Sequence, residues 1–390
     1  MMGEKLRVAM IGYGFMGKVH SNAWRGVNRF FPQAPEVEMA LICGRNEAAL
    51  KDAAATFGWK ETETDWRKVI ARSDIDIIDV STSGETHAEI SNAALAAGKH
   101  VICEKPLANT SEEAQSMVKA AADAAAKGVQ SMVAFNYRRV PAVAFAKQLV
   151  EQGRLGTIYH VRAEYLQDWI VDPEFPLVWR LEKDKAGSGA LGDIGSHIVD
   201  ATQFITGSHI TSVSGQMKTF IKKRPLLAAL DGGLRASGSE KMGDVTVDDA
   251  AVFTANFDNG AIGVFEATRF ATGHKNGMSV EISGSKGTLS FTFESMNELM
   301  FHDHTLPATE AGFRRISVTQ AEHPYVAAWW PPGHILGYEH TFTHEVYDFL
   351  MGIKSGKAAL PSFADGLNVQ NVLKAVEASS NNESKLTKVN

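Results

Sequence analysis

Cysteine is scarce in this chain of 390 residues, which contains only Cys43 and Cys103. Each cysteine lies at the end of an expected strand, and two isolated cysteines provide neither a disulfide framework nor a cysteine metal site. This usage is typical of a protein with reduced thiols, so we predict a cytoplasmic location.

Long hydrophobic runs and clusters of positive charge are also missing. No window holds 18 uncharged apolar residues, and residues 1–5 lack the apolar core and cleavage site of a signal peptide. Lysine and arginine number 39 against 45 acidic residues, and the one basic cluster, residues 222–224, is interpreted as a solvated loop. The net charge of −6 gives no general attraction for nucleic acid or anionic lipid, so we expect neither partner.

What is present is the composition of a well-packed globular protein. A hydrophobic content of 44% and a charged content of 22% are ordinary for folded chains, and 390 residues exceed the usual size of one domain. We therefore expect two domains, at residues 1–135 and 136–390.

The first domain begins with a strand, a glycine turn and a helix. The apolar residues 6–11 lead into Gly12-Tyr13-Gly14-Phe15-Met16-Gly17, and a helical pattern continues through Arg29. Such glycines permit a tight turn and the close approach of a pyrophosphate to the N–H groups at the helix start. Chance alone supplies roughly 0.25 matches to this pattern in such a chain, so its position between strand and helix carries the prediction.

Strands and helices continue to alternate up to residue 135. Strands are expected at 38–43, 76–81, 101–103 and 129–135, with a helix before each of the last three. This alternation predicts an α/β fold with a doubly wound parallel sheet, in which ligands bind at the carboxyl ends of the strands.

Several polar residues are expected at that edge of the sheet. Arg45 follows the second strand where many such folds have an acid for the ribose, which favours NADP, although arginine there is also compatible with NAD. His87 opens a helix and serves either a ligand or the structure. The cofactor-binding residues predicted in this half are Gly12, Tyr13, Gly14, Phe15, Met16, Gly17, Arg45, Ser81, Thr82, His87, Glu104 and Lys105.

The stretch His100–Pro106 places two opposite charges where an apolar strand ends. Pro106 fixes its own backbone and keeps Lys105 out of the helical region, so the lysine is held extended as the strand leaves the sheet. A surface lysine before a loop proline is the simpler interpretation when the stretch is taken alone.

The second half is mostly antiparallel. Alternating segments are joined by hairpin signals at 258–260 and 285–287, which predicts an α+β domain with a large open-faced sheet. Its last helix could pack back on the first domain. Residues 222–244 show little periodicity and are expected to form a long loop or a subunit contact.

An aspartate and a histidine stand four residues apart in this half. On a helix Asp193, His197 and Asp200 would share one face, and a carboxylate beside an imidazole can orient it for proton transfer. An ordinary surface pair or a capped core histidine is the structural alternative. A zinc site would need a third ligand that the segment lacks.

Other polar and aromatic residues suit a polyhydroxylated ligand, because rings cover its C–H faces and amides bind its hydroxyls. Each of these residues taken singly is more often a packing residue or part of a surface ion pair. The substrate-binding residues predicted are Tyr137, Arg138, Tyr165, Gln167, Trp169, Asp193 and His197, with Trp179 and Arg180 assigned to the cofactor.

The glycine motif at 12–17, Glu104-Lys105-Pro106 and the motif at 192–197 occur in the order found in one enzyme family. The sequence resembles the glucose-fructose oxidoreductase, inositol dehydrogenase and MocA (Gfo/Idh/MocA) family over roughly residues 5–379, including 362–366. Within the family, segments 136–139, 165–169 and 186–191 look most similar to an anhydrosugar dehydrogenase.

The resemblance implies a Rossmann domain, an open-faced sheet domain, bound NAD or NADP, and a homotetramer or homodimer. It also implies that Lys105, Asp193 and His197 are catalytic. Two departures affect the cofactor site: Thr82-Ser83 replaces the usual Thr-Pro, and Gly44 stands where many members have an acid.

We therefore expect oxidation of a secondary hydroxyl of a sugar, a levoglucosan-like anhydrosugar or a cyclitol by hydride transfer to nicotinamide. In this hypothesis His197 accepts the hydroxyl proton, Asp193 orients the substrate and the imidazole, and Lys105 stabilises the reacting oxygen. Two alternatives stay open: cofactor-assisted elimination or hydrolysis of a glycoside without net cofactor turnover, and a non-catalytic dinucleotide- or sugar-binding regulator.

Overall fold

The computed structural model describes residues 5–232 and 235–390 and divides the chain into two compact units. Unit 1 comprises Met1–Asn136 and Tyr338–Asn368, and unit 2 comprises Tyr137–Gly337 and Val369–Asn390. From the sequence, all of 136–390 was expected in the second domain, whereas the structure groups Tyr338–Asn368 with the first. None of the helices in the described ranges has the length and hydropathy needed to cross a bilayer.

Unit 1 contains a six-stranded parallel sheet with the strand order β3-β2-β1-β4-β5-β6, which confirms the predicted doubly wound fold. The edge strand β3 was not predicted, because its three residues are exposed or half-buried and carry no apolar signal. The strands are β1 (Leu6–Ile11), β2 (Val37–Cys43), β3 (Glu61–Glu63), β4 (Ile77–Val80), β5 (His100–Glu104) and β6 (Ser131–Ala134).

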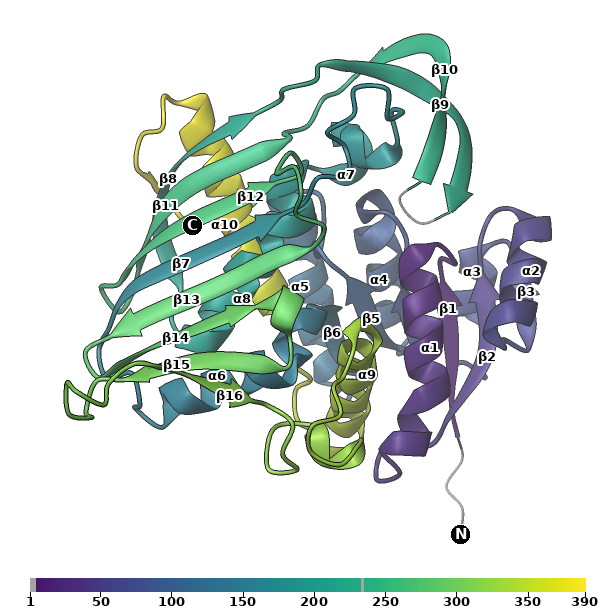
Figure 1. The fold of residues 1–390 in the computed structure, drawn as a ribbon. Coiled ribbons are helices and arrows are strands. Elements are labelled where there is room, and N and C mark those ends of the chain that lie inside the picture. The colour runs from purple at the N-terminus through teal and green to yellow at the C-terminus, as the bar shows by residue number, and fades with distance from the viewer. Residues whose placement is uncertain (1–4, 233–234) are drawn as a thin grey trace. The chain divides into compact units, whose positions relative to one another are not determined.

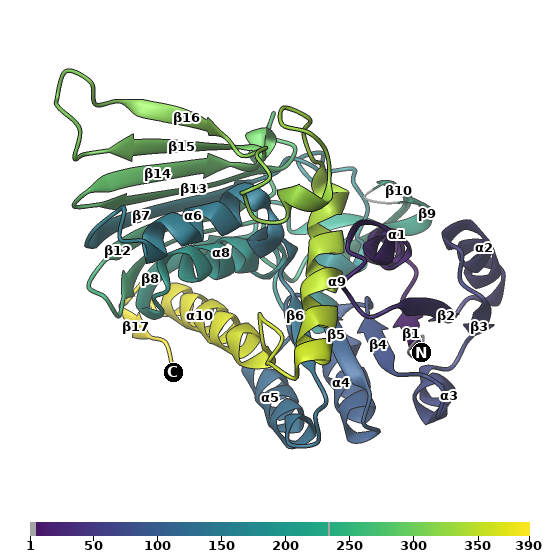
Figure 2. The ribbon, with the colours of Figure 1, turned by 90° about the horizontal axis from the view of Figure 1, so that it is seen from below.

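Helices cover both faces of this sheet, with α1 and α9 on one face and α4 and α5 on the other (Figure 2). Helix α9 belongs to unit 1 because its aromatic residues pack on α1 and the chain that follows it: Tyr347 stacks on Phe31 at 4.3 Å and Phe342 lies 5.5 Å from His20. The helices of this unit are α1 (Phe15–Phe30), α2 (Glu47–Phe57), α3 (Trp66–Ala71), α4 (His87–Ala96), α5 (Ser111–Ala125) and α9 (Tyr338–Ser355).

Unit 2 is built on a nine-stranded sheet with the order β16-β15-β14-β13-β7-β12-β11-β8-β17 (Figure 1). Both predicted hairpins are confirmed, at β11–β12 and β13–β14, and among the described strands of this sheet only β7 and β12 pair in parallel. The strands are β7 (Ile158–Leu166), β8 (Ile210–Lys218), β11 (Ala250–Phe257), β12 (Ile262–Thr268), β13 (Gly277–Gly284), β14 (Gly287–Thr292), β15 (Glu298–Asp303), β16 (Phe313–Ser317) and β17 (Thr387–Lys388).

Helices α6 (Pro141–Glu151) and α8 (Ser196–Thr206) lie along one face of this sheet (Figure 2). The strands alternate accordingly: in β11 every second residue from Ala251 to Phe257 is buried and the residues between are exposed. Two further helices are α7 (Lys183–Ala186) and α10 (Phe363–Asn381), and the C-terminal part of α10 binds β8 through Ser379 and Ser380, whose hydroxyls accept backbone N–H groups of Gly215 and Met217.

Residues 222–244, expected as a long loop or a subunit contact, form an antiparallel ribbon of β9 (Lys223–Gly232) and β10 (Arg235–Asp244), so the long-loop prediction was wrong and the subunit contact stays a prediction. Residues 233 and 234 lie outside the described residues. The pairing register shifts between Arg235 and Ala236, Ser237 and Gly238, and Gly238 and Met242. Each shift interrupts the two-residue period, which explains why the sequence showed no strand pattern.

Both cysteines lie at strand ends in unit 1 and are buried. Burial, together with the nearby charges of Glu63 and Asp65, raises the pKa of Cys43 to about 12, and burial also raises the pKa of Cys103. Because the thiolate is the reactive form, we expect neither thiol of the folded protein to react with a disulfide reagent at mildly alkaline pH, and both to react after unfolding in guanidinium. A thiol that reacts at once in the folded protein would contradict the burial of the cysteines and their raised pKa values.

Candidate active site

The glycine turn of unit 1 is closely packed and ends at an uncapped helix. Gly12 has φ +112°, and a Cβ atom there would lie 2.4 Å from the Ser81 carbonyl oxygen, so only glycine fits. Helix α1 starts after Gly14 with no side-chain cap and no acidic residue in its first turn. An anion can therefore meet the N–H groups of this helix, and the turn fits the pyrophosphate of a dinucleotide.

Tyr13, Phe15 and Met16 occupy this turn, and Phe15 is 47% exposed. The Tyr13 ring packs on Gly44 at the end of β2, where a Cβ atom would lie 2.1 Å from Tyr13 Cε1. This contact accounts for glycine at the position where many related folds carry an acid. Arg45, which follows it, is exposed.

Side-chain hydrogen bonds hold the loop after β4 in place. Ser81 Oγ donates to Asp79 Oδ1 at 2.8 Å, and Thr86 Oγ1 donates to Thr82 Oγ1 at 2.7 Å. His87 is buried with its ring nitrogens 3.0 Å from the Pro106 carbonyl and 3.1 Å from the Thr82 carbonyl, and burial lowers its pKa. These contacts favour the structural interpretation of His87, as a link between the loop after β4 and the loop after β5.

Glu104 and Lys105 stand where β5 ends, beside β4 and one strand removed from β1. The Glu104 carboxyl is almost fully buried, and its Oε2 atom accepts the backbone N–H of Lys105 at 3.0 Å. The Lys105–Pro106 peptide bond is cis. Unit 1 thus brings the glycine turn, the loop after β4 and Lys105 to the carboxyl ends of adjacent parallel strands, the edge at which such folds bind ligands.

A buried histidine below this edge was not predicted. His20 Nδ1 lies 2.9 Å from Asp79 Oδ2 and His20 Nε2 lies 2.9 Å from Glu104 Oε1. Burial disfavours the imidazolium, but the charges and hydrogen bonds of Asp79 and Glu104 outweigh it and raise the pKa of His20 well above its ordinary value. A histidine inside an amphipathic helix gives no local signal that two strand ends will supply its partners.

In unit 2, the segment that carries Asp193 is not a regular α-helix. Leu191–Gly195 forms a π-helical turn, and α8 begins at Ser196. Asp248 fixes the start of this turn by accepting the backbone N–H groups of Gly189 at 2.7 Å and Leu191 at 2.8 Å. The prediction of one continuous helical stripe is corrected here, and single π-turns are frequent at functional sites.

Asp200 and Arg138, both predicted on sequence grounds, pair with each other. Arg138 Nε donates to Asp200 Oδ2 at 2.8 Å and Arg138 Nη2 donates to Asp200 Oδ1 at 2.6 Å, and both side chains are buried. This two-point ion pair joins α8 to the residues that precede α6. It gives Arg138 a structural contact, and its role toward a substrate stays a prediction.

His197 lies against two tyrosines whose hydroxyls belong to one hydrogen-bond cycle. The His197 ring is 4.6 Å from the Tyr137 ring and 5.9 Å from the Tyr165 ring. Tyr165 Oη donates to Asn276 Oδ1 at 2.7 Å, Asn276 Nδ2 donates to Tyr137 Oη at 3.3 Å, and the two hydroxyls are 2.7 Å apart. One assignment of protons therefore satisfies all three side chains.

This cycle extends to two more predicted residues. Gln167 Nε2 donates to Asn276 Oδ1 at 3.0 Å, and Trp169 Nε1 donates to Gln167 Oε1 at 3.0 Å. Unit 2 therefore brings Tyr137, Tyr165, Gln167 and Trp169 together beside His197. Asn276 was missed because it lies in a turn before β13 with no pattern around it.

Asp193 faces a buried arginine that was also not predicted from the sequence. Arg269 is fully buried and its Nη1 atom is 3.8 Å from Asp193 Oδ2, while its Nη2 atom donates to the Asp248 carbonyl at 3.0 Å. Burial lowers the pKa of Arg269, and the charges of Asp193 and Asp248 act in the opposite direction. A positive charge is thus built in beside the predicted catalytic carboxylate.

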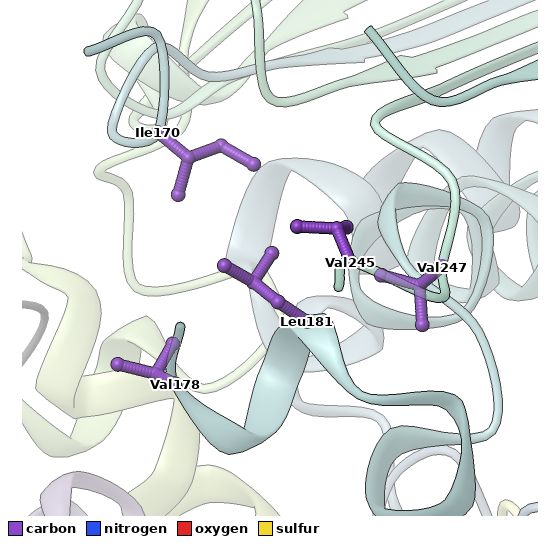
Figure 3. Close-up of a cluster of buried hydrophobic side chains, with 5 residues drawn as sticks. All are labelled: Ile170, Val178, Leu181, Val245 and Val247. Carbon is purple, nitrogen blue, oxygen red and sulfur yellow. The ribbon is translucent and has the colours of Figure 1, made fainter. Parts of the chain in front are cut away.

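Trp179 and Arg180 form a half-buried pair on a short turn, with the Arg180 guanidinium 4.4 Å from the Trp179 ring centre. Val178 and Leu181 anchor this turn on both sides in a hydrophobic cluster (Figure 3). The cluster consists of Ile170, Val178, Leu181, Val245 and Val247. Trp169 packs against the same cluster, so these two predicted ligand segments share one hydrophobic base.

Within the described ranges, no group of three or more histidine, cysteine and acidic side chains is arranged to hold a metal ion. The side chains described above offer hydrogen bonds, charges and aromatic faces. Their chemistry suits an organic ligand with hydroxyl groups and an anionic cofactor.

Two family models match the chain. Residues 6–135 match an oxidoreductase family with an NAD-binding Rossmann fold, and residues 143–290 match the GFO/IDH/MocA C-terminal domain. Together these matches cover most of the chain, and they correspond to the parallel sheet of unit 1 and to the larger part of unit 2.

Full-length relatives give the same result. The chain is 42% identical over 388 residues to levoglucosan dehydrogenase of Pseudarthrobacter phenanthrenivorans, covering 98% of this chain and 97% of that protein. An oxidoreductase domain protein from Kribbella flavida is 57% identical, with a TM-score of 0.94 and all of both chains covered. A levoglucosan dehydrogenase in complex with NADH and levoglucosan is 41% identical, with a TM-score of 0.92, 99% of this chain covered and 100% of the other.

Proposed function

The chain belongs to the Gfo/Idh/MocA family of NAD-binding oxidoreductases, and we propose that it oxidises a secondary hydroxyl of levoglucosan or a closely similar sugar to a ketone. The similarity to levoglucosan dehydrogenase over nearly the whole chain supports this substrate class. Other relatives act on different sugars and cyclitols, among them an inositol 2-dehydrogenase that is 24% identical.

The observation that carries the proposal is the hydrogen-bond cycle of Tyr137, Tyr165 and Asn276 beside His197. The cycle fixes two aromatic rings and several polar atoms next to an imidazole. Rings of this kind cover the C–H faces of a pyranose, and fixed amides and hydroxyls bind its hydroxyl groups. A base beside a preorganised sugar-binding surface is what alcohol oxidation requires.

Three side chains of the chain have assigned roles in the proposed reaction. His197 accepts the proton of the reacting hydroxyl as the ketone forms. Asp193, held beside Arg269, orients the substrate and the imidazole. The ammonium of Lys105 hydrogen-bonds the reacting oxygen and stabilises the negative charge that develops on it.

The bound nicotinamide dinucleotide supplies the acceptor for the hydride that leaves the same carbon. In unit 1 the glycine turn and the uncapped start of α1 fit its pyrophosphate. Tyr13, in the turn after β1, and Arg45, after β2, are the residues proposed to contact its adenosine half.

The test is formation of reduced nicotinamide with a panel of levoglucosan, L-sorbose, glucose 6-phosphate, apiose and inositol, each with NAD and with NADP. We expect the highest kcat/KM with levoglucosan. A folded protein that binds the dinucleotide but reduces it with none of these compounds would refute the proposal. Where no reduced nicotinamide forms, product analysis of the sugar separates elimination or hydrolysis without net cofactor turnover from binding without reaction.

Arg45 is expected to set the preference between the two cofactors. Its exposed guanidinium can form a charge-assisted contact with a 2′-phosphate, and such a contact is worth about 1.5–3 kcal/mol. The Arg45→Ala variant should therefore lower kcat/KM for NADP about tenfold or more relative to kcat/KM for NAD. Arg67→Ala, another exposed arginine of unit 1, is the control. An unchanged NADP-to-NAD ratio would show that Arg45 does not contact the 2′ position.

A further inference from the structure

Three ionisable side chains are buried together beneath the carboxyl ends of β4 and β5. His20 comes from α1, Asp79 from β4 and Glu104 from the last position of β5, and their exposed fractions are 1%, 0% and 4%. The imidazole lies between the two carboxyl groups, with each ring nitrogen 2.9 Å from a carboxyl oxygen.

Counting donors shows how one imidazole can satisfy both carboxylates. A neutral imidazole has one N–H group and could donate to only one carboxylate, and its other nitrogen would face the second carboxylate lone pair to lone pair. Two contacts of equal length are satisfied when the imidazole carries both protons. The charges of Asp79 and Glu104 raise the pKa of His20 against the opposing effect of burial, in agreement with this count.

The cluster is connected to Lys105 on its Glu104 side. Glu104 Oε1 binds the imidazole, and Glu104 Oε2 accepts the backbone N–H of Lys105 at 3.0 Å. The Asp79 side is held independently, because Trp24 Nε1 donates to Asp79 Oδ2 at 2.7 Å and Ser81 Oγ donates to Asp79 Oδ1 at 2.8 Å. His20 is the side chain that joins these two sides.

We propose that His20 is a positioning residue for Lys105, because its doubly bound imidazole holds the Glu104 carboxylate that anchors the backbone amide of Lys105. This inference rests on the proposed function, in which Lys105 contacts the reacting oxygen. Without the imidazole, two buried carboxylates would face each other and Glu104 would turn away. The backbone amide of Lys105 would then lose its hydrogen bond to Glu104. The glycine turn at 12–17 is built from other residues and would keep its conformation.

The test compares three variants by kcat, by KM for sugar and by dinucleotide affinity. His20→Gln should lower kcat tenfold or more with little change in dinucleotide affinity, since its NH₂ group can replace only one of the two ring nitrogens and its carbonyl oxygen then faces the other carboxylate. Glu104→Met, which removes the acceptor of the Lys105 amide, should lower kcat by a similar factor. Trp24→Phe removes a donor to Asp79 from the same helix but leaves the link from His20 through Glu104 to Lys105, so its kcat should stay near that of the unchanged protein.

A double variant, His20→Gln with Glu104→Gln, separates positioning from mere stability. Its two new side-chain amides can pair with each other: the NH₂ group introduced at position 104 donates to the oxygen introduced at position 20, whose own NH₂ group donates to Asp79. The new oxygen at position 104 can still accept the Lys105 amide. The double variant should therefore recover at least part of the kcat lost in His20→Gln. Melting temperatures of all variants are measured alongside, because restored pairing can also restore stability: a recovery of kcat that exceeds the recovery of the melting temperature assigns a positioning role to the pair.

Two results would overturn the inference: a folded His20→Gln protein with unchanged kcat, or a Trp24→Phe protein that loses as much kcat as Glu104→Met. If His20→Gln does not fold, the double variant takes its place: a folded double variant with kcat as low as that of Glu104→Met overturns the inference, and one with kcat clearly above it supports the inference. Failure of the proposed function looks different, because the unchanged protein would then bind the dinucleotide but reduce it with none of the sugars.

Discussion

Replacing Lys105 with alanine is expected to lower kcat for sugar oxidation by about two to three orders of magnitude. The lysine follows the last residue of β5, and its backbone amide is held by the buried Glu104 carboxyl. Its ammonium therefore starts from a fixed point at the edge of the sheet. In the proposed reaction the lost group stabilises charge on the reacting oxygen, which matters in the transition state more than in the bound substrate.

Dinucleotide affinity should change much less in the same variant, because the glycine turn and the start of α1 are intact. Fluorescence titration with NADH measures that affinity, and absorbance of reduced nicotinamide measures turnover. Lys119→Ala is the matched control, since Lys119 is 80% exposed on α5 and pairs only with Asp123 among the salt bridges described. Equal turnover in Lys105→Ala and in the control would show that the lysine has no part in the chemistry.

The first half of the chain could be predicted in detail because its signals are local. A strand, a glycine turn and a helix follow one another within residues 6–30, and the parallel sheet then fixes which edge carries the loops. The position of Glu104 and Lys105 at the edge that carries Gly12 follows from that topology alone. The hairpins at 258–260 and 285–287 were equally local.

The residues that were missed are defined by tertiary contacts. Arg269 follows β12, and its partners Asp193 and Asp248 come from two other segments. Asn276 joins two tyrosines that lie more than 100 positions before it. Neither residue has a periodic neighbour or a motif, so only the folded structure identifies them.

The π-turn at Leu191–Gly195 was hidden for a different reason. The sequence showed an aspartate and a histidine with the spacing of one helical turn, and that spacing is the same in the sequence whether the turn is α or π. Asp248 accepts the backbone N–H groups of Gly189 and Leu191 from outside the helix, a tertiary contact at the start of the turn that the spacing does not contain. The four-residue spacing therefore identified Asp193 and His197 as candidates but did not predict the backbone conformation of the turn that carries Asp193.

His197→Ala is expected to lower kcat for sugar oxidation by about 10²–10⁴-fold, the usual contribution of a general base. The reason is that no other group beside the tyrosine cycle is assigned to accept the hydroxyl proton. Free imidazole added to the variant should restore part of the activity, because truncation to alanine leaves space where the ring stood against Tyr137, 4.6 Å away. The measurement is the initial rate of nicotinamide reduction against imidazole concentration.

Tyr137→Phe provides the matched comparison for this prediction, since it keeps the ring against His197 and removes only the hydroxyl from the cycle with Tyr165 and Asn276. In the proposed function that hydroxyl helps to fix the sugar, so its loss should raise KM more than it lowers kcat. An imidazole that restores His197→Ala but not Tyr137→Phe would assign proton transfer to the histidine. If His197→Ala keeps full turnover, the base of the reaction is another group and the tyrosine cycle serves binding alone.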